Sequence, residues 1–191
     1  MPNWAITDYV IEGPNETLLK IQKAIEEHEV EEGSSENWEG NVLKALGIEW
    51  DRKKYYTRGF IQEASREEDV IIFYAEEAWG TTDFGLLLES KFPDIKVYYQ
   101  TEEEGLEVYV TNDVEGKHFK DRWYVDTCVN GNYEYDYFIE EEDMWDWLCN
   151  ITNGKVKSME DAEAFNEEKK NTDDYIGIHE FKILEPEEIK L

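Results

Sequence analysis

The histidines and cysteines are the side chains most often used for chemistry, and none of them is spaced for it. His28, His118 and His179 each lack another histidine or cysteine three or four residues away. A structural zinc site needs about four such ligands, usually in spaced pairs. Cys128 and Cys149 are too few for a disulfide framework and are expected as buried thiols. The sequence therefore predicts no metal site and no reactive cysteine.

Carboxylates are so numerous that pairs of them do not identify acid–base catalysis. The chain holds 47 Asp and Glu residues, and the runs at 102–104 and 140–143 are typical of solvated faces and turns. Residues 112–116 lack the alternating oxygen ligands of an EF-hand loop. The chain also has no glycine-rich phosphate loop, dinucleotide fingerprint or serine nucleophile elbow. We therefore expect no cofactor and no catalytic residue, and favour a protein that is not an enzyme.

The charge of the 191-residue chain limits its partners. The net charge is −28 and is spread over the length, with −12 in residues 1–95 and −16 in residues 96–191. Such a field opposes direct binding to nucleic acid and to anionic membranes. Basic proteins, cations or no particular partner remain, and a basic protein is the partner that we expect. A compact chain of this length has a diameter of roughly 40 Å. Duplex DNA of that length carries on the order of 24 charges, which is close to the net charge of this chain, so mimicry of DNA is one hypothesis. A surface that only confers solubility is the other.

Composition favours a folded protein of the cytoplasm. Hydrophobic residues make up 40% of the chain and aromatic residues 14%, enough for a core. No apolar run approaches the roughly 18 residues of a membrane helix. The first residues lack the basic and apolar regions of a signal peptide. We expect one domain over residues 1–191.

The first half of the chain predicts an α+β fold of the ferredoxin-like, split βαβ type, with helices on one face of an antiparallel sheet. Its core would span residues 4–101, with Asn15 and either Thr81 or Thr82 as helix caps. The strand beginning at residue 70 is continuously apolar and is expected to be buried on both faces. The expected elements are strands at 4–12, 55–64, 70–74 and 95–101, and helices at 16–29, 38–46 and 82–92.

The remainder, residues 102–191, is expected to extend this sheet with a β-hairpin and helices. Asn130-Gly131 indicates the hairpin turn. Tyr133, Tyr135 and Tyr137 then alternate with acids, which places three rings on one face. That face could cover either the sheet's own helix or a second subunit. The other expected elements are strands at 106–111, 119–129 and 175–184, and helices at 140–150 and 159–170, the latter capped by Ser158.

Aromatic residues beside acids are the candidate interaction surface. The doublet Tyr98-Tyr99 must point one ring outward if it lies in a strand. Tyrosine and tryptophan are common hot spots of protein interfaces, although packing at a sheet edge explains them equally well. The candidate residues are Trp4, Trp79, Tyr98, Tyr99, Glu102, Glu103 and Glu104.

Two stretches of residues 1–110 resemble a family of small uncharacterised bacterial proteins carried by phages, plasmids and conjugative elements. The first stretch is Met1-Pro2-Asn3-Trp4 followed by Ile11-Glu12-Gly13. The second is Phe73, Ala78-Trp79, Phe92-Pro93-Asp94 and Glu104-Gly105. The resemblance implies a ferredoxin-like domain and an accessory protein of a mobile element. It supplies no activity and no site residues.

The chain departs from that family at three places, which makes it a distant relative at most. Ala5 stands where the family often has cysteine, and Gly80-Thr81 stand where it has prolines. Residues 106–108 replace its Phe-x-Gly.

Two functions follow as hypotheses. The first is a non-enzymatic acidic module that binds a basic host or element-encoded protein, in its strongest version as a DNA mimic. The alternative is an enzyme or small-ligand binder with a cleft between the sheet and residues 140–170. Recognition of RNA by the ferredoxin-like sheet ranks last, because the charge has the wrong sign.

Overall fold

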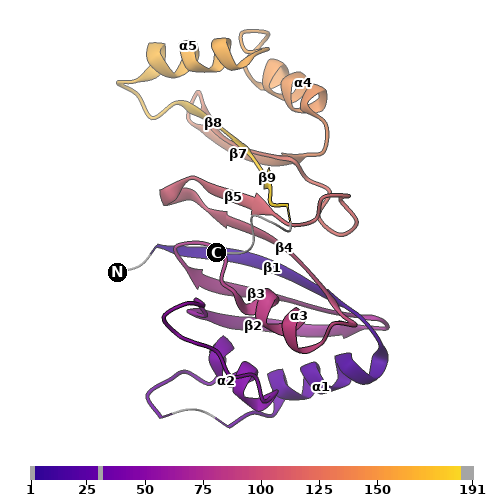
Figure 1. Ribbon diagram of the computed structural model, residues 1–191. Helices are drawn as coiled ribbons and strands as arrows, with labels where there is room; N and C mark the ends of the chain where they lie inside the picture. The colour runs from indigo at the N-terminus through magenta and orange to yellow at the C-terminus, as the bar shows by residue number, and fades with distance from the viewer. Residues whose placement is uncertain (1–2, 30–31, 186–191) are drawn as a thin grey trace. The chain divides into compact units, whose positions relative to one another are not determined.

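A computed structural model describes residues 3–29 and 32–185 of the chain as a mixed α+β protein with two sheets (Figure 1). The chain divides into two compact units, Met1–Val114 with Ile183–Leu191, and Glu115–Lys182. Each unit has its own sheet and its own core. The division falls after Val114, whereas the sequence placed the start of an extension at residue 102. The prediction that the hairpin of residues 123–138 extends the first sheet was wrong, because that hairpin belongs to a separate three-stranded sheet.

The first unit is built on a six-stranded sheet in the order β2-β3-β1-β4-β5-β9. The four pairs from β2 to β5 are antiparallel. The elements are β1 (Trp4–Glu12), α1 (Asn15–Glu26), α2 (Glu39–Ala45), β2 (Gly59–Glu67), β3 (Val70–Ala78), α3 (Phe84–Lys91), β4 (Lys96–Glu103), the 3-10 helix η1 (Glu104–Leu106), β5 (Val108–Thr111) and the two-residue β9 (Lys182–Ile183).

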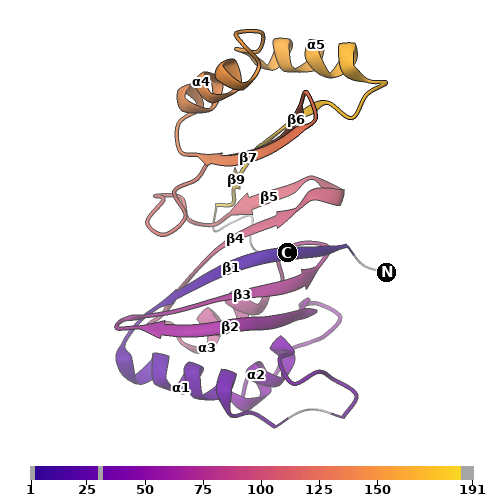
Figure 2. The same ribbon diagram turned by 180° about the vertical axis from the view of Figure 1, so that it is seen from behind.

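Alternation along β1 separates the two faces of this sheet. Ala5, Thr7 and Tyr9 are buried, whereas Trp4, Ile6 and Asp8, which alternate with them, are exposed. The buried set faces the core beneath α1, α2 and α3, which lie on one side of the sheet (Figure 2). Helices thus cover only one face. For that reason β3 alternates between buried and half-buried residues, and the prediction of burial on both faces was wrong.

Several boundaries in the first unit differ from prediction. Helix α1 begins at Asn15 and ends at Glu26, and Pro14 occupies the cap position before it. Asn15 is therefore the first residue of the helix and not its cap. Asp83 directly precedes α3 but makes no capping hydrogen bond with its side chain. The hydroxyl of Thr82, one of the two predicted caps, accepts a hydrogen bond from the Phe84 amide at 3.3 Å. Strand β2 begins at Gly59 instead of residue 55, because residues 55–58 bond to other segments: the Tyr56 amide donates to the Asp83 carboxylate.

The second unit is a three-stranded antiparallel sheet in the order β7-β6-β8. Helices α4 and α5 pack on one face through a core that includes Val125, Met144, Leu148, Phe165 and Ile176. The elements are β6 (Trp123–Val129), β7 (Asn132–Phe138), α4 (Glu141–Ile151), α5 (Met159–Lys169) and β8 (Tyr175–Glu180).

Local sequence signals correctly predicted the hairpin turn and a helix cap in this unit. Asn130 and Gly131 both have positive φ, 52° and 76°, as a tight hairpin turn requires. Ser158 accepts a hydrogen bond from the Asp161 amide at the start of α5. The expected last strand is divided at buried Phe181 into β8 and β9, and residues 186–191 lie outside the described part.

Candidate functional site

Trp4 and Trp79, two of the predicted interaction residues, lie together at one end of the first sheet. Trp4 pairs with Ala78 in the register of β1 and β3, and the Trp79 amide donates to the Asn3 carbonyl at 2.8 Å. The guanidinium of Arg58 lies over both rings, 5.9 Å from the Trp4 centroid and 5.3 Å from that of Trp79. The two tryptophan residues are 40% and 48% exposed, and Arg58 is exposed as well, so this end presents two tryptophans and one cation to solvent.

The backbone holds Trp79 in an unfavourable conformation. Its φ is +66°, in the left-handed region that bulky residues avoid. Such a residue costs on the order of 1–3 kcal/mol and persists only where its surroundings fix it. Here the hydrogen bond to Asn3 and the Arg58 contact do so. The strain is the kind found at functional positions.

The other predicted residues do not join this group. Tyr99 is buried in the core and Tyr98 is half-buried on the opposite face of β4. The carboxylate of Glu103 is also buried, and it accepts hydrogen bonds from the amides of Gly105 and Leu106, which makes it a structural cap of η1. The remaining two acids lie nearer the surface: Glu102 is half-buried and pairs with Ile6 in the sheet, and Glu104 is exposed.

A pocket of about 460 Å³ opens beside Arg58. Its volume lies in the range of small-molecule sites, about 300–1,000 Å³. Arg58 and Arg52 are its cationic residues. The other lining residues are Glu32, Gly33, Ser34, Ser35, Trp38, Tyr55, Tyr56, Thr57 and Phe60. The alternative hypothesis expected a cleft against residues 140–170. Where α4 and α5 meet their own sheet, that space holds the apolar core described above.

Two carboxyl groups are fully buried next to this pocket wall. The Glu77 carboxylate, on β3, accepts hydrogen bonds from the hydroxyls of Thr7 and Tyr9, the latter at 2.7 Å. Glu39 begins α2, and its Oε1 has no hydrogen-bond partner among the described residues. That oxygen lies against Gly59, where an added Cβ would come within 2.3 Å of it. Glycine is therefore required at the position before Phe60.

One of these two carboxyls must carry a proton. Thr82 Oγ1 lies 2.9 Å from Glu39 Oε2 and 2.8 Å from Glu77 Oε1, but a threonine has only one hydrogen to donate. One carboxyl must therefore be protonated and donate to Thr82. Burial, with the charge of Glu77, raises the pKa of Glu39 well above its ordinary value of 4.5. Glu39 carries the proton, and Thr82 donates to Glu77.

The second unit presents a different surface, the face of its sheet away from α4 and α5. We call it the tyrosine face. Tyr133 and Tyr135 are each 70% exposed, among the most exposed large side chains described. The strand register sets Tyr135 beside Asp126. The face consists of Tyr124, Asp126, Cys128, Tyr133, Tyr135, Tyr137, Tyr175, Gly177 and His179. The predicted alternation of tyrosines is confirmed, and the rings do not cover the helices of this unit.

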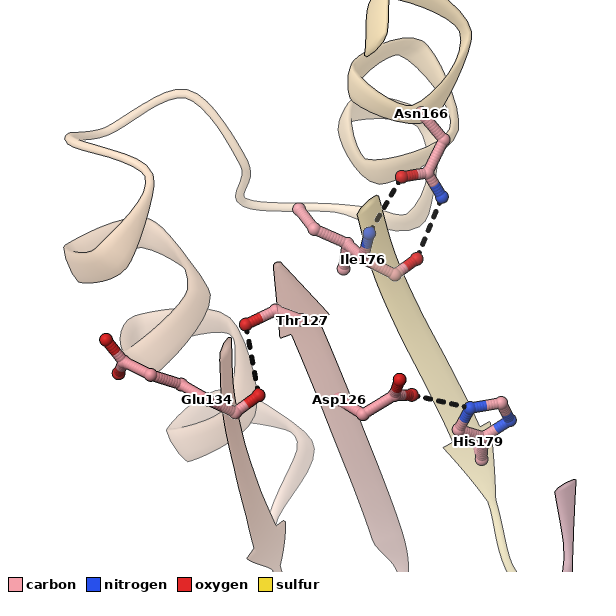
Figure 3. Close-up of polar contacts among 6 residues, drawn as sticks. All are labelled: Asp126, Thr127, Glu134, Asn166, Ile176 and His179. Carbon is pink, nitrogen blue, oxygen red and sulfur yellow. Dashed lines mark hydrogen bonds and ion pairs between the residues drawn. The ribbon is translucent and has the colours of Figure 1, made fainter. Parts of the chain in front are cut away.

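Asp126 is the charged centre of the tyrosine face. It contacts His179 Nε2 at 3.0 Å across the β6–β8 pair (Figure 3). An added Cβ at Gly177 would come within 2.3 Å of its carboxylate, so the glycine makes room for it. The hydrogen bond from His179 lowers the pKa of Asp126. The Asp126 hydrogen bond in turn raises the pKa of Tyr175. Asp126 therefore stays ionised at neutral pH.

This arrangement does not form a catalytic triad. Cys128 is on the same face, but it pairs with Tyr175, whereas His179 pairs with Tyr124 further along the strand. Cys128 is buried, as predicted, and Cys149 is partly exposed. Across residues 3–29 and 32–185, no group of three or more His, Cys, Asp or Glu side chains is arranged to hold a metal ion.

Sequence reasoning did not identify Arg58, the Glu39–Glu77 pair or the Asp126–His179 contact. Each joins residues far apart in the chain: 53 positions separate Asp126 and His179. The pairing of β6 with β8 brings them together, and local patterns do not specify that pairing. Alternation in β6 was the one usable signal, since it places Asp126 on the face opposite Val125.

The fold and sites define an α+β protein of two compact units with aromatic surfaces. No helix in the described part of the chain is long and apolar enough to cross a membrane. Comparison with protein-family models, with curated proteins and with solved structures gave no match in any of the three.

Proposed function

We propose that the chain is a protein-binding module that takes up a basic segment of a partner on the tyrosine face of its second unit. The observation that carries this proposal is a sheet face that α4 and α5 leave uncovered, with exposed tyrosines around the ionised Asp126. An arginine or lysine over an aromatic ring gains about 0.5–1 kcal/mol at an exposed site and about 2 kcal/mol when desolvated. A carboxylate in reach of the same cation adds a charge-assisted hydrogen bond.

The net charge of −28 supports the same class of partner. Long-range attraction concentrates basic segments near the protein and speeds their encounter. The rings and Asp126 then supply the local recognition that charge alone lacks. Strand β7 is exposed along Asn132–Tyr137 at the edge of its sheet, which leaves space for an extended segment.

Titration calorimetry with a synthetic arginine–glycine repeat peptide tests the proposal. Tyr135→Ala and Asp126→Asn should each weaken binding by about tenfold or more. The matched control is Asp136→Asn, which removes the same charge from β7 on the opposite face. It should change affinity by less than about threefold, because an exposed charge is largely screened. Equal losses for Asp126→Asn and Asp136→Asn would show attraction by net charge only and contradict the proposal.

Two finer proposals accompany this function. The strand order β2-β3-β1-β4, with α1 and α3 in its connections, supports a split βαβ arrangement of the first unit. The stronger functional version is competition with DNA for a basic surface. Duplex DNA added to a captured partner should displace the module, and retention of the module would count against mimicry. An origin in a mobile element and a cytoplasmic location stay predictions from sequence.

A further inference from the structure

The residues that line the pocket beside Arg58 carry a net positive charge, opposite in sign to that of the chain. Two arginines line it, and Glu32 is the only acid among its lining residues described above. The guanidinium of Arg58 rests on Trp4 and Trp79 and meets no carboxylate within the described residues. In a protein of net charge −28, an arginine left without an acid is an unusual arrangement. The pocket thus offers a cation to a ligand.

Flat aromatic walls complete the lining. Trp38, Tyr55, Tyr56 and Phe60 all contribute to the pocket. Arg52 lies 5.2 Å from the Trp38 ring centroid, so a second guanidinium is stacked at the same wall. Rings of this kind bind planar groups by stacking, and guanidinium groups bind carboxylates and phosphates with two parallel hydrogen bonds.

The walls are held in place before any ligand arrives. The Trp38 indole donates to the Thr57 carbonyl at 2.9 Å, which fixes the ring. Asn41 donates to the Ser35 carbonyl at 2.9 Å and fixes the loop on the other side. The backbone of Tyr56 exchanges hydrogen bonds with Asp83. Such preorganisation reduces the entropy lost on binding.

We propose that this pocket binds a small planar anion: an aromatic or nucleobase ring that carries a carboxylate or a phosphate. The ring would stack on the aromatic wall, and the anionic group would pair with Arg58 and Arg52. This site belongs to the first unit and is independent of the tyrosine face.

Two probes distinguish the two sources of this chemistry. Benzoate represents an aromatic carboxylate and AMP a nucleotide, with benzyl alcohol and adenosine as their neutral counterparts. Binding is followed by tryptophan fluorescence, since Trp38 lines the pocket, and is checked by NMR. At least one anion should bind saturably and about tenfold more tightly than its neutral counterpart. Saturation by AMP alone identifies a nucleotide, and saturation by benzoate alone an aromatic carboxylate.

Variants locate the binding. Arg58→Gln should weaken it by about tenfold or more. Lys96→Gln removes the same charge at the opposite end of β1, where Lys96 pairs with Glu12, and should leave affinity within about twofold. Circular dichroism confirms that both variants are folded. Failure of both anions to saturate, equal binding of the neutral probes, or unchanged affinity in Arg58→Gln would each overturn the proposal.

Discussion

The two units place aromatic side chains at the surface with opposite charges beside them. In the first unit Arg58 stands between Trp4 and Trp79, while the carboxyls of Glu39 and Glu77 are buried. In the second unit the charges are placed the other way round. The surface acid Asp126 lies among the rings of the tyrosine face, and the core is apolar. A net charge of −28 therefore describes the surface around Asp126 but not the surface around Arg58. The position of a few charges decides which ligand each surface suits.

The buried carboxyls also make the first unit more sensitive to change. A carboxylate removed from water must be hydrogen-bonded, and each partner depends on it in return. The Glu77 carboxylate accepts hydrogen bonds from the hydroxyls of Thr7, Tyr9 and Thr82. Asp126, by contrast, keeps access to water, so its loss leaves fewer groups unsatisfied.

Replacement of Glu77 or of Asp126 should give the largest difference in lost stability between the two units. Glu77→Ala removes the buried acceptor shared by the hydroxyls of Thr7, Tyr9 and Thr82 and should cost about 3 kcal/mol or more, whereas Asp126→Ala should cost about 1 kcal/mol. Urea unfolding followed by NMR reads each unit separately. Glu76→Ala, the neighbouring position on the other face of β3, is the control and should stay within about 0.5 kcal/mol. Equal costs for the Glu76 and Glu77 variants would contradict a structural role for the buried network.

Asn166 is the corresponding anchor of the second unit. Its amide accepts from the Ile176 N–H and donates to the Ile176 carbonyl, both at 2.8 Å, and so ties α5 to β8 (Figure 3). Asn166→Ala should cost about 2 kcal/mol, and it should loosen the strand that positions His179. Hydrogen exchange of the β8 amides measures this directly. Asn171→Ala, at an exposed site, is the control; unchanged exchange in Asn166→Ala would disprove the anchor.

The pH dependence of the two units should have opposite signs. The raised pKa of Glu39 means that its contribution to stability is complete below about pH 4.5 and is lost as pH rises. The lowered pKa of Asp126 means that its contribution is present above about pH 3.8 and is lost on further acidification.

Glu39→Gln imitates the protonated carboxyl and isolates the first of these effects. Wild type should lose up to about 1.4 kcal/mol per pH unit across the titration of Glu39, and the variant should lose less. Unfolding of the first unit, measured from pH 5 upward, tests this. Parallel pH profiles for the two proteins would mean that Glu39 does not hold the proton.

Local sequence patterns predicted the elements better than the sites. β-Branched and aromatic residues predicted β1 with the bounds that the structure shows, and Asn130-Gly131 located the hairpin of the second unit. Those features depend on neighbours in the chain. Glu39 and Glu77, like Asp126 and His179, meet only through long-range packing, and an acidic chain offers many equivalent pairs. Trp4 and Trp79 were identified as aromatic residues of the candidate interaction surface. Arg58, which contacts both rings, carried no local signal.

The smallest effect concerns the strain at Trp79. Trp79→Ala removes the ring from Arg58 but keeps a side chain at φ +66°, whereas Trp79→Gly removes the ring and relieves the strain. Glycine should therefore be more stable than alanine by about 1 kcal/mol at this position, as the cost of the left-handed conformation implies. Thermal unfolding of the two variants measures the difference. Both lack the indole, so the comparison does not depend on the contact with Arg58. Equal stability would mean that the backbone is relaxed at this position, and then only the exposed rings and their cation would distinguish this end of the first unit from an ordinary sheet edge.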